Sequence, residues 1–394
     1  MIYIDELVMQ EKIYQAILFS VLFTMLYTYA GYPMLLMLLK HLKPRKAKNY
    51  SESVSKCPSV SFIITAYNEE KAIKGKILNT LKLDYPAEKM QIIVASDGST
   101  DQTEEIARSF SSRNVKLISV SGRKGKTAVQ NAAVVQATGD ILVFSDATSM
   151  YEKDAIKELV RFFDDPEIGC VGGRLIYRTE GNSASSKGGK TYWEYERWIK
   201  ENEAEINSLI GVSGAIYAVR KSIYTNIPPD QISDFVIALQ TVEYGYRVAY
   251  APRATCSETT IRQAGNEFGM RVRITLRSLR ALWYKRAIIN PFRYGFYSVQ
   301  LISHKLFRYL TPQMLLILIL FNALLLENLA YRYFFGVQVG FYSLAIAGRI
   351  LDSKGYYFKP ASMAYYFCLI NIASLLAFFR FMMGERMITW EPIR

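Results

Sequence analysis

Acidic and polar residues follow three apolar runs in the first half of the chain: YNE at 67–69, DGS at 97–99 and DAT at 146–148. A carboxylate beside a phosphate group is unfavourable unless a divalent cation lies between the two. Asp146 comes directly after the run ILVFS and is a candidate ligand for such a cation. The spacing therefore indicates a site for a phosphate-containing molecule and a metal ion.

A short basic loop, GRKGK at 122–126, can neutralise a diphosphate. Lys124 and Lys126 carry the charge, and Gly122 and Gly125 let the backbone approach a ligand. A solvated surface loop is the alternative interpretation. The chain has neither GxxxxGK[ST] nor GxGxxG after a strand, which disfavours a P-loop ATPase and a Rossmann dehydrogenase.

Apolar, β-rich runs alternate with helix-like stretches between about residues 59 and 256. The runs are SVSFIITAY, QIIVASD, VKLISV, DILVFSD and IGCVGGRLIY. The stretch 101–110 has glutamates in its first turn and an arginine near its end, as helices favour. This alternation is typical of right-handed βαβ units and predicts a mostly parallel sheet. Ligands bind at the carboxyl ends of such strands, so the three polar groups are expected at one crevice.

The uncharged stretch 13–39 is long enough to cross a bilayer, since about 20 apolar residues span the hydrocarbon core. A signal peptide is disfavoured because the run is too long, acidic residues precede it and no small-residue cleavage site follows. The basic segment KHLKPRKAK at 40–48 is expected to face the cytosol, which puts the N-terminus outside.

Three further apolar runs lie at about 310–326, 333–350 and 361–379, and each can cross a membrane. Three crossings place the C-terminus outside. If one of the three segments is re-entrant, the C-terminus lies on the cytosolic side. Ahead of them, the segment 269–292 interleaves arginines with apolar residues. This pattern predicts a basic amphipathic helix in the headgroup region.

Composition supports this division of the 394 residues. The chain is 51% hydrophobic, more than is usual for a soluble enzyme, and its net charge of +13 fits a phosphate-rich partner or an anionic membrane face. Four scattered cysteines and two histidines disfavour a zinc site and a disulfide framework. Much of the positive charge lies at membrane borders, which disfavours a nucleic-acid partner.

The expected parts are an N-terminal transmembrane helix with its basic segment (1–49), a cytosolic domain (50–263) with a flexible surface loop at 181–190, amphipathic interface helices (264–309) and about three transmembrane helices (310–394).

Several motifs, by their order and spacing, resemble the family 2 glycosyltransferases. The first are SFIITAYNEE at 61–70, SDGSTD at 96–101 and FSDA at 144–147. GKTA at 125–128, GAIYAVR at 214–220 and Asp234 ahead of a helix are further matches. With membrane segments on both sides, the chain looks like the membrane-integrated branch, which includes cellulose, chitin, hyaluronan and poly-N-acetylglucosamine synthases. The resemblance implies a Rossmann-like α/β domain of the glycosyltransferase-A type with a mostly parallel sheet, plus α-helical transmembrane segments.

The activity that this resemblance implies is an inverting transfer of sugar from a nucleotide sugar, a UDP-sugar, with Mg²⁺ or Mn²⁺ as cofactor. The acceptor would be a glycan or a lipid-linked molecule at the cytosolic membrane face. The protein would be a multi-pass protein of the cell membrane that acts in the synthesis of cell-surface or extracellular polysaccharide. Its partners would be the donor, the acceptor and the lipid bilayer.

The same resemblance implies roles for individual residues. Asp234 would be the general base that deprotonates the acceptor hydroxyl. Asp146 would bind the metal and the diphosphate, and Arg273 would stabilise the departing diphosphate. The other nucleotide-sugar contacts would come from Ala66, Tyr67, Glu69, Asp97 and Lys126, and the acceptor contacts from Gly214 and Ala215.

The sequence departs from the family pattern in three motifs. Thr148 stands where the metal motif Asp-x-Asp has its second carboxylate, so a hydroxyl or a water must substitute. Ser233 stands where an acidic residue usually precedes the base. The motif Gln-x-x-Arg-Trp keeps its arginine but has Met270 and Ile274 at its ends, without the tryptophan under the acceptor sugar. These departures put processive synthesis in doubt and motivate an alternative, a catalytically degenerate transferase-like subunit of a polysaccharide synthesis or secretion complex.

Structural roles are the alternative for each candidate. Asp97 and Asp234 can cap the helices that follow them, and Asp146 can be a turn residue after its strand. The arginines around Arg273 can bind anionic lipid. His304 is expected to be a structural residue at the membrane interface.

Overall fold

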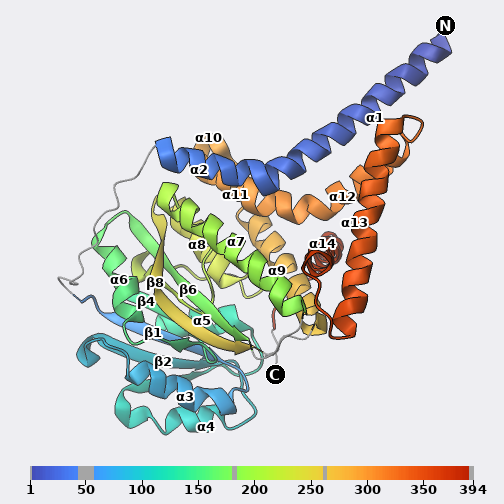
Figure 1. The fold of residues 1–394 in the computed structure, drawn as a ribbon. Helices are drawn as coiled ribbons and strands as arrows, with labels where there is room; N and C mark the ends of the chain where they lie inside the picture. Colours follow the sequence, from blue (N-terminus) through green and yellow to red (C-terminus); the bar gives the residue numbers. More distant parts are fainter. Residues whose placement is uncertain (1, 43–56, 180–183, 261–263, 390–394) are drawn as a thin grey trace.

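The computed structural model describes residues 2–42, 57–179, 184–260 and 264–389. Its centre is an eight-stranded sheet with the strand order β3-β2-β1-β4-β7-β6-β8-β5 (Figure 1). The strands are β1 (Val60–Ala66), β2 (Met90–Ser96), β3 (Val115–Ser119), β4 (Ile141–Asp146), β5 (Met150–Tyr151), β6 (Ile168–Thr179), β7 (Tyr217–Arg220) and β8 (Arg247–Thr260).

The sheet is mixed but mostly parallel. β1 pairs in parallel with β2 and β4, β2 with β3, and β6 with β8. β7 is antiparallel to β4 and β6, and β5 is antiparallel to β8. The five apolar runs form β1, β2, β3, β4 and β6, so this part of the sequence prediction is confirmed. The short strands β5 and β7 and the long strand β8 were not predicted.

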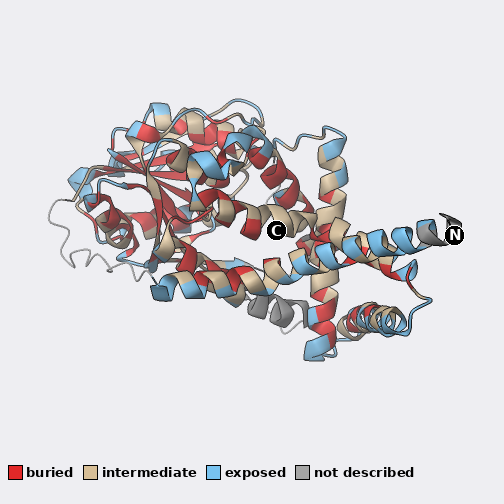
Figure 2. Cartoon of the chain, turned by 90° about the horizontal axis from the view of Figure 1, so that it is seen from above, coloured by how far each residue is buried: buried red, intermediate tan, exposed pale blue. Residues whose placement is uncertain are grey.

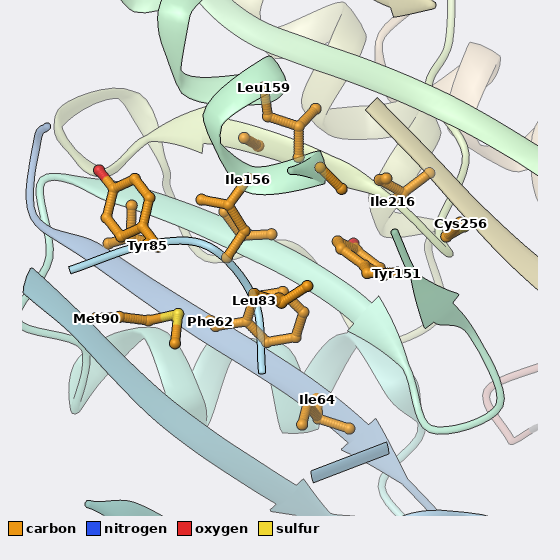
Figure 3. Packing of buried hydrophobic residues seen from close by; sticks show 14 of the residues in the cluster. Phe62, Ile64, Leu83, Tyr85, Met90, Tyr151, Ile156, Leu159, Ile216 and Cys256 are labelled. Carbon is orange, nitrogen blue, oxygen red and sulfur yellow. The ribbon is translucent and has the colours of Figure 1, made fainter. Parts of the chain in front are cut away.

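Helices cover both faces of the sheet because successive side chains of a strand point to opposite sides. Phe62 and Ile64 of β1 belong to one buried cluster, and Ile63 belongs to the other. Figure 3 shows part of the first cluster, in which Ile156 and Tyr151 lie close to Phe62. The first face is covered by α3 (Glu70–Leu81), α4 (Thr103–Arg108) and α6 (Ala155–Val160), and the second by α5 (Lys126–Val135) and α8 (Ser233–Glu243).

Four stretches of helix among the described residues are long and apolar enough to cross a membrane: Val8–Leu42, Phe296–Ala323, Leu329–Ser353 and Lys359–Met382. α1 packs against α12, and α13 packs against α14. Figure 2 shows many exposed residues along α1, in contrast to the buried strands of the sheet. The helices that form these stretches are α1 (Ile2–Leu26), α2 (Tyr32–Leu42), α11 (Phe296–Leu301), α12 (Phe307–Ala323), α13 (Leu329–Ser353) and α14 (Lys359–Met382).

The chain returns to the sheet domain after α14. Arg280 of α9 (Ala264–Tyr284) donates a hydrogen bond to the carbonyl oxygen of Glu385 at 2.5 Å. A β-carbon at Gly125 would collide with the carbonyl oxygen of Ile388, so the C-terminal segment lies directly against the basic loop. Three full crossings by α12, α13 and α14 would put this segment on the opposite side of the membrane. The contact favours one re-entrant segment, and the number of full crossings stays a prediction.

The segment 181–190 is not the surface loop that its composition suggested. Residues 181–183 lie outside the described residues, and helix α7 (Ala184–Ile206) includes 184–190. The later turns of α7 are held by packing, since Ile199 is fully buried against Tyr32 and Leu36 of α2. Once a helix is anchored, each further residue adds a hydrogen bond, and this gain outweighs the poor helix propensity of serine and glycine.

Helix α9 is basic and amphipathic, as expected, but the protein itself binds much of its surface. Leu276 is buried against α14. Arg271 donates to the Glu267 carboxylate at 3.0 Å, and Arg277 donates to a backbone carbonyl oxygen of the sheet domain at 2.6 Å. Trp283 remains 63% exposed. Arg271 and Arg277 therefore bind groups of the protein, and the place of α9 in the headgroup region stays a prediction.

A buried polar cluster joins α7 to the start of α12. His304 lies in the π-helical turn before α12 and hydrogen-bonds with Glu203 at 2.8 Å and with Glu196 at 3.1 Å. The Tyr32 hydroxyl donates to Glu203 at 2.6 Å, and Arg308 donates to Glu196. These contacts fix the sheet domain against the apolar helices and fit the structural role expected for His304.

Candidate active site

A cleft of about 850 Å³ opens where β1 and β4 end. Glu69, Lys126, Asp146, Asp234 and Arg273 all line it. These predicted site residues come from the start of α3, α5, the end of β4, α8 and α9, segments that are far apart in the sequence. The sheet brings them together because the ends of its parallel strands meet at one edge.

Asp146 is the last residue of β4 and lies at the centre of the cleft's charges. Its Oδ1 atom accepts a hydrogen bond from the Thr65 hydroxyl at 3.3 Å and an ion-pair hydrogen bond from the Lys126 ammonium group. Two residues further on, Thr148 is exposed and lines the same cleft. The chain therefore presents a carboxylate and a hydroxyl where the family pattern has two carboxylates.

The basic loop at 122–126 is held by Asp97. This carboxylate is fully buried and accepts hydrogen bonds from the backbone N–H groups of Lys124 at 2.7 Å and Gly125 at 3.1 Å. Burial raises the pKa of Asp97, and the two backbone donors and the charge of Arg123 act in the opposite direction. Gly125 has φ +90°, a conformation that other residues rarely adopt. Asp97 thus positions the loop that begins α5, and its expected hydrogen bond to a nucleotide stays a prediction.

Asp234 lies in the first turn of α8 and lines the cleft. Its Oδ1 atom accepts a hydrogen bond from the Phe235 backbone at 2.7 Å. A β-carbon built on Gly214 would lie 2.8 Å from Asp234 Oδ2 and 3.1 Å from the Lys126 nitrogen. Burial raises the pKa of Asp234, and the positive charges of Lys126 and Arg277 lower it. A raised pKa brings a carboxylate closer to the range that suits a general base at neutral pH.

Two arginines of α9 supply positive charge to the cleft. Arg273 and Arg277 both line it, one turn apart. Burial lowers the pKa of Arg273, and the negative charge of Asp146 opposes that effect. Guanidinium groups beside a carboxylate suit an anionic ligand such as a diphosphate. The positions that depart from the family motif, Met270 and Ile274, also line the cleft.

Of the three residues predicted to form the base pocket, Ala66 and Tyr67 are not among the described residues that line the cleft. Ala66 is buried at the end of β1, and Tyr67 follows it. The Arg123 guanidinium lies 4.1 Å from the centre of the Tyr67 ring, a cation–π contact that the sequence analysis missed. Glu69 lines the cleft, and its backbone N–H donates to the Thr103 hydroxyl at 2.7 Å. Contacts of these residues with a base stay predictions.

The two residues expected to contact an acceptor differ in position. Gly214 lies beside Asp234, and its carbonyl oxygen is 3.5 Å from the Lys126 nitrogen. Ala215 is buried in the hydrophobic core, where its carbonyl oxygen accepts a hydrogen bond from the Tyr151 hydroxyl at 3.1 Å. Neither Gly214 nor Ala215 is among the described residues that line the cleft.

The sequence analysis also missed Glu258. This residue lies near the end of β8 and lines the cleft together with Asp146. The only signal in the sequence was one carboxylate among uncharged residues in the stretch 254–260, and the strand that carries it was not predicted.

A hard divalent cation fits the chemistry at Asp146. Carboxylate and hydroxyl oxygens are the ligands that Mg²⁺ and Mn²⁺ prefer. The Lys126 ammonium group, which contacts Asp146, shows that a cation is accommodated at this carboxylate. Within the described part of the chain, no group of three or more histidine, cysteine, aspartate or glutamate side chains is arranged to hold a metal. Water and the diphosphate of a donor would therefore have to complete the coordination.

Comparisons with known proteins agree with this architecture. The fold of a mannosyltransferase from Pyrobaculum calidifontis, PcManGT in complex with GDP-Man and Mn²⁺, matches 92% of this chain and 99% of that chain, with a TM-score of 0.68 and 20% identity. Two bacterial relatives are similar in sequence. The poly-β-1,6-N-acetyl-D-glucosamine synthase of Staphylococcus aureus (strain COL) is 26% identical over 227 residues, which cover 56% of this chain and 55% of the relative. The synthase of the same name from Staphylococcus epidermidis is 25% identical over 220 residues, which cover 54% of this chain and 53% of the relative.

The fold is that of a glycosyltransferase of the A type. In the described part of the chain, four stretches of helix are long and apolar enough to cross a membrane. Residues 61–227 match the family described as Glycosyl transferase family 2. The matched region spans about half the length of the two synthases.

Proposed function

We propose that this protein is an inverting glycosyltransferase that moves a sugar from a UDP-sugar to a glycan or lipid-linked acceptor at the cytosolic face of the cell membrane. Synthesis of cell-surface or extracellular polysaccharide is the process that fits this reaction and the similarity to the two synthases. One observation carries the proposal. A carboxylate with a raised pKa, Asp234, shares a cleft with Asp146, Lys126 and Arg273, the groups that suit a metal-bound diphosphate.

The reaction needs few groups from the protein. Asp234 accepts the proton of the acceptor hydroxyl as its oxygen attacks the anomeric carbon, while the bond from that carbon to the diphosphate oxygen breaks. The nucleoside diphosphate leaves with the electron pair of this bond. Arg273 and Lys126 stabilise the negative charge that develops on it. A divalent cation at Asp146, when bound, supplies further charge stabilisation to the same diphosphate.

The membrane helices suggest why the acceptor meets the site at the membrane surface. Arg273 and Arg277 lie on α9, which packs along α14, one of the apolar helices. The cleft and the apolar helices thus share a wall. A lipid-linked or nascent glycan acceptor can reach Asp234 without leaving the membrane surface.

A panel of nucleotide sugars, offered to the purified full chain with and without EDTA, tests the proposal. We expect turnover of a UDP-sugar that chelation abolishes and that added Mn²⁺ or Mg²⁺ restores. Full turnover in EDTA contradicts the metal requirement. Absence of turnover with every donor, by a protein that still binds UDP, favours the alternative of a degenerate transferase-like subunit.

A further inference from the structure

Glu258 occupies a position that the family's metal motif does not describe. β5 and β8 pair antiparallel, with Met150 opposite Ser257, and this register puts Glu258 beside the turn that follows β4. The Ser149 hydroxyl donates a hydrogen bond to Glu258 Oε1. Ser149 in turn donates its backbone N–H to the carbonyl oxygen of Asp146 at 3.3 Å. Two hydrogen bonds thus connect Glu258 to the residue expected to hold the metal.

Each of the two carboxylates keeps one oxygen atom available. Asp146 uses Oδ1 for Thr65 and Lys126, and Glu258 uses Oε1 for Ser149. Among the residues that the structure describes, neither Asp146 Oδ2 nor Glu258 Oε2 accepts a hydrogen bond. Both side chains line the same cleft.

The electrostatics at this edge favour a cation between the two carboxylates. The negative charges of Asp146 and Glu258 repel each other, and the positive charges of Lys126 and Lys76 offset part of that repulsion. Like charges held together in a partly buried site are unfavourable unless a cation joins them. Lys76 is fully buried beneath the turn and donates to the carbonyl oxygen of Ser149 at 2.5 Å, so it fixes the turn and balances part of the charge.

Other acidic residues of the cleft are already engaged. Asp101 accepts hydrogen bonds from the Thr103 backbone at 3.0 Å and from the Glu70 backbone at 3.1 Å, which cap the neighbouring helices. Asp234 lies against Gly214. Glu258 is the carboxylate that hydrogen bonds connect to the turn after β4.

We propose that Glu258, together with Asp146, supplies the carboxylate oxygens that hold the divalent cation, in place of the second carboxylate that Thr148 lacks. This inference rests on the proposed function, because the cation is the one that accompanies the nucleotide-sugar donor. The metal site is thus built from two distant parts of the chain, and the missing acidic residue of the Asp-x-Asp motif does not imply a degenerate enzyme.

The test is the affinity for Mn²⁺ in the presence of UDP, measured on the purified full chain by the electron paramagnetic resonance signal of free Mn²⁺. Glu258→Gln keeps an acceptor oxygen for Ser149 but removes the charge. We expect this variant to bind Mn²⁺ at least about tenfold more weakly than the wild type, since even the loss of an outer partner of a ligand costs 10–100-fold. Glu152→Gln is the matched control, because Glu152 is an exposed carboxylate just beyond β5 and does not line the cleft.

The double variant Thr148→Asp, Glu258→Gln separates a ligand from a merely structural residue. Restoring the Asp-x-Asp motif should recover Mn²⁺ affinity to within about threefold of the wild type if a second carboxylate is what Glu258 provides. Wild-type affinity in Glu258→Gln overturns the proposal, and so does a weakened affinity that the double variant does not recover. If Glu258→Gln fails to fold, Glu258→Asp is measured in its place. We expect Glu258→Asp to bind Mn²⁺ more weakly than the wild type, and unchanged binding contradicts the proposal.

Failure of this inference and failure of the proposed function give different results. A wild-type protein that binds Mn²⁺ through Glu258 but transfers no sugar refutes the proposed function and leaves the metal site in place. A protein that transfers sugar with Mn²⁺ affinity independent of Glu258 refutes the metal site alone.

Discussion

A β-carbon at Gly214 would lie 2.8 Å from Asp234 Oδ2, closer than carbon and oxygen atoms can approach without a shift. The Lys126 nitrogen would lie 3.1 Å from the same carbon. The two charged side chains that we place at the reaction centre thus approach each other over a backbone without a side chain. The close approach of these two side chains favours glycine here, whereas the backbone conformation does not, because Gly214 is not among the glycines with positive φ.

Gly214→Ala should therefore impair catalysis more than folding. Displacement of Asp234 or Lys126 by a fraction of an ångström to 1 Å is expected to lower the transfer rate up to roughly 10²-fold. Sugar transfer and thermal unfolding are to be measured on the same preparation. Gly269→Ala is the control, because nothing lies within 4 Å of a β-carbon at that exposed position of α9. Wild-type transfer by Gly214→Ala contradicts the assigned geometry.

Asp234→Asn should separate binding from chemistry. The amide cannot accept the proton, so we expect transfer to fall by roughly 10²- to 10⁴-fold, while affinity for UDP changes little. Glu243→Gln, at the other end of α8 and paired with Lys285, should leave both quantities near the wild type. Transfer at the wild-type rate by Asp234→Asn rules out this residue as the base.

Arg277→Met should move the pH dependence of transfer. Arg277 lowers the pKa of Asp234, which burial raises, so removing the positive charge raises that pKa further. A base with a higher pKa loses its proton at higher pH, and the acidic limb of kcat/KM against pH should shift to higher pH. Arg286→Gln, an exposed change beyond the end of α9, should leave the limb in place. A limb that stays in place or moves to lower pH in Arg277→Met contradicts Asp234 as the group that titrates.

Asp97→Ala should loosen the basic loop. The change removes the acceptor for the backbone N–H groups of Lys124 and Gly125, and an unsatisfied buried donor such as that of Gly125 costs about 1–3 kcal/mol. We expect a lower free energy of unfolding and weaker UDP binding, both measured by denaturation with and without UDP. Asp140→Ala, whose carboxylate accepts from the exposed Ser59 hydroxyl, is the control. Unchanged UDP affinity in Asp97→Ala would show that the loop does not depend on this carboxylate.

Cysteine labelling in sealed vesicles tests the side of the C-terminal segment. Met383→Cys and Lys124→Cys, both at exposed positions, should react with an impermeant reagent from the same side, because the segment after α14 contacts the sheet domain. Met9→Cys, at the exposed start of the first apolar stretch, should react from the other side. If position 383 reacts from the side of position 9, the contact between Arg280 and Glu385 does not exist in the membrane.

The sequence by itself determined the local features of this protein. Apolar runs such as the one ending at Asp146 specify strands because their side chains are buried on both faces of a parallel sheet. Long uncharged runs specify helices that can cross a membrane, since length and hydropathy decide that property. The candidates Asp146, Asp234 and Arg273 were found for the same reason, since each lies within a short motif.

Only the tertiary structure decided how distant segments meet. Glu258 reaches the turn after β4 through the pairing of β5 with β8, a contact across more than a hundred residues that no local pattern records. The approach of Ile388 to Gly125 is equally non-local, and hydropathy gives no sign of it. Packing also overrode composition where α7 continues through residues 184–190, because tertiary contacts of its later turns outweigh local propensity.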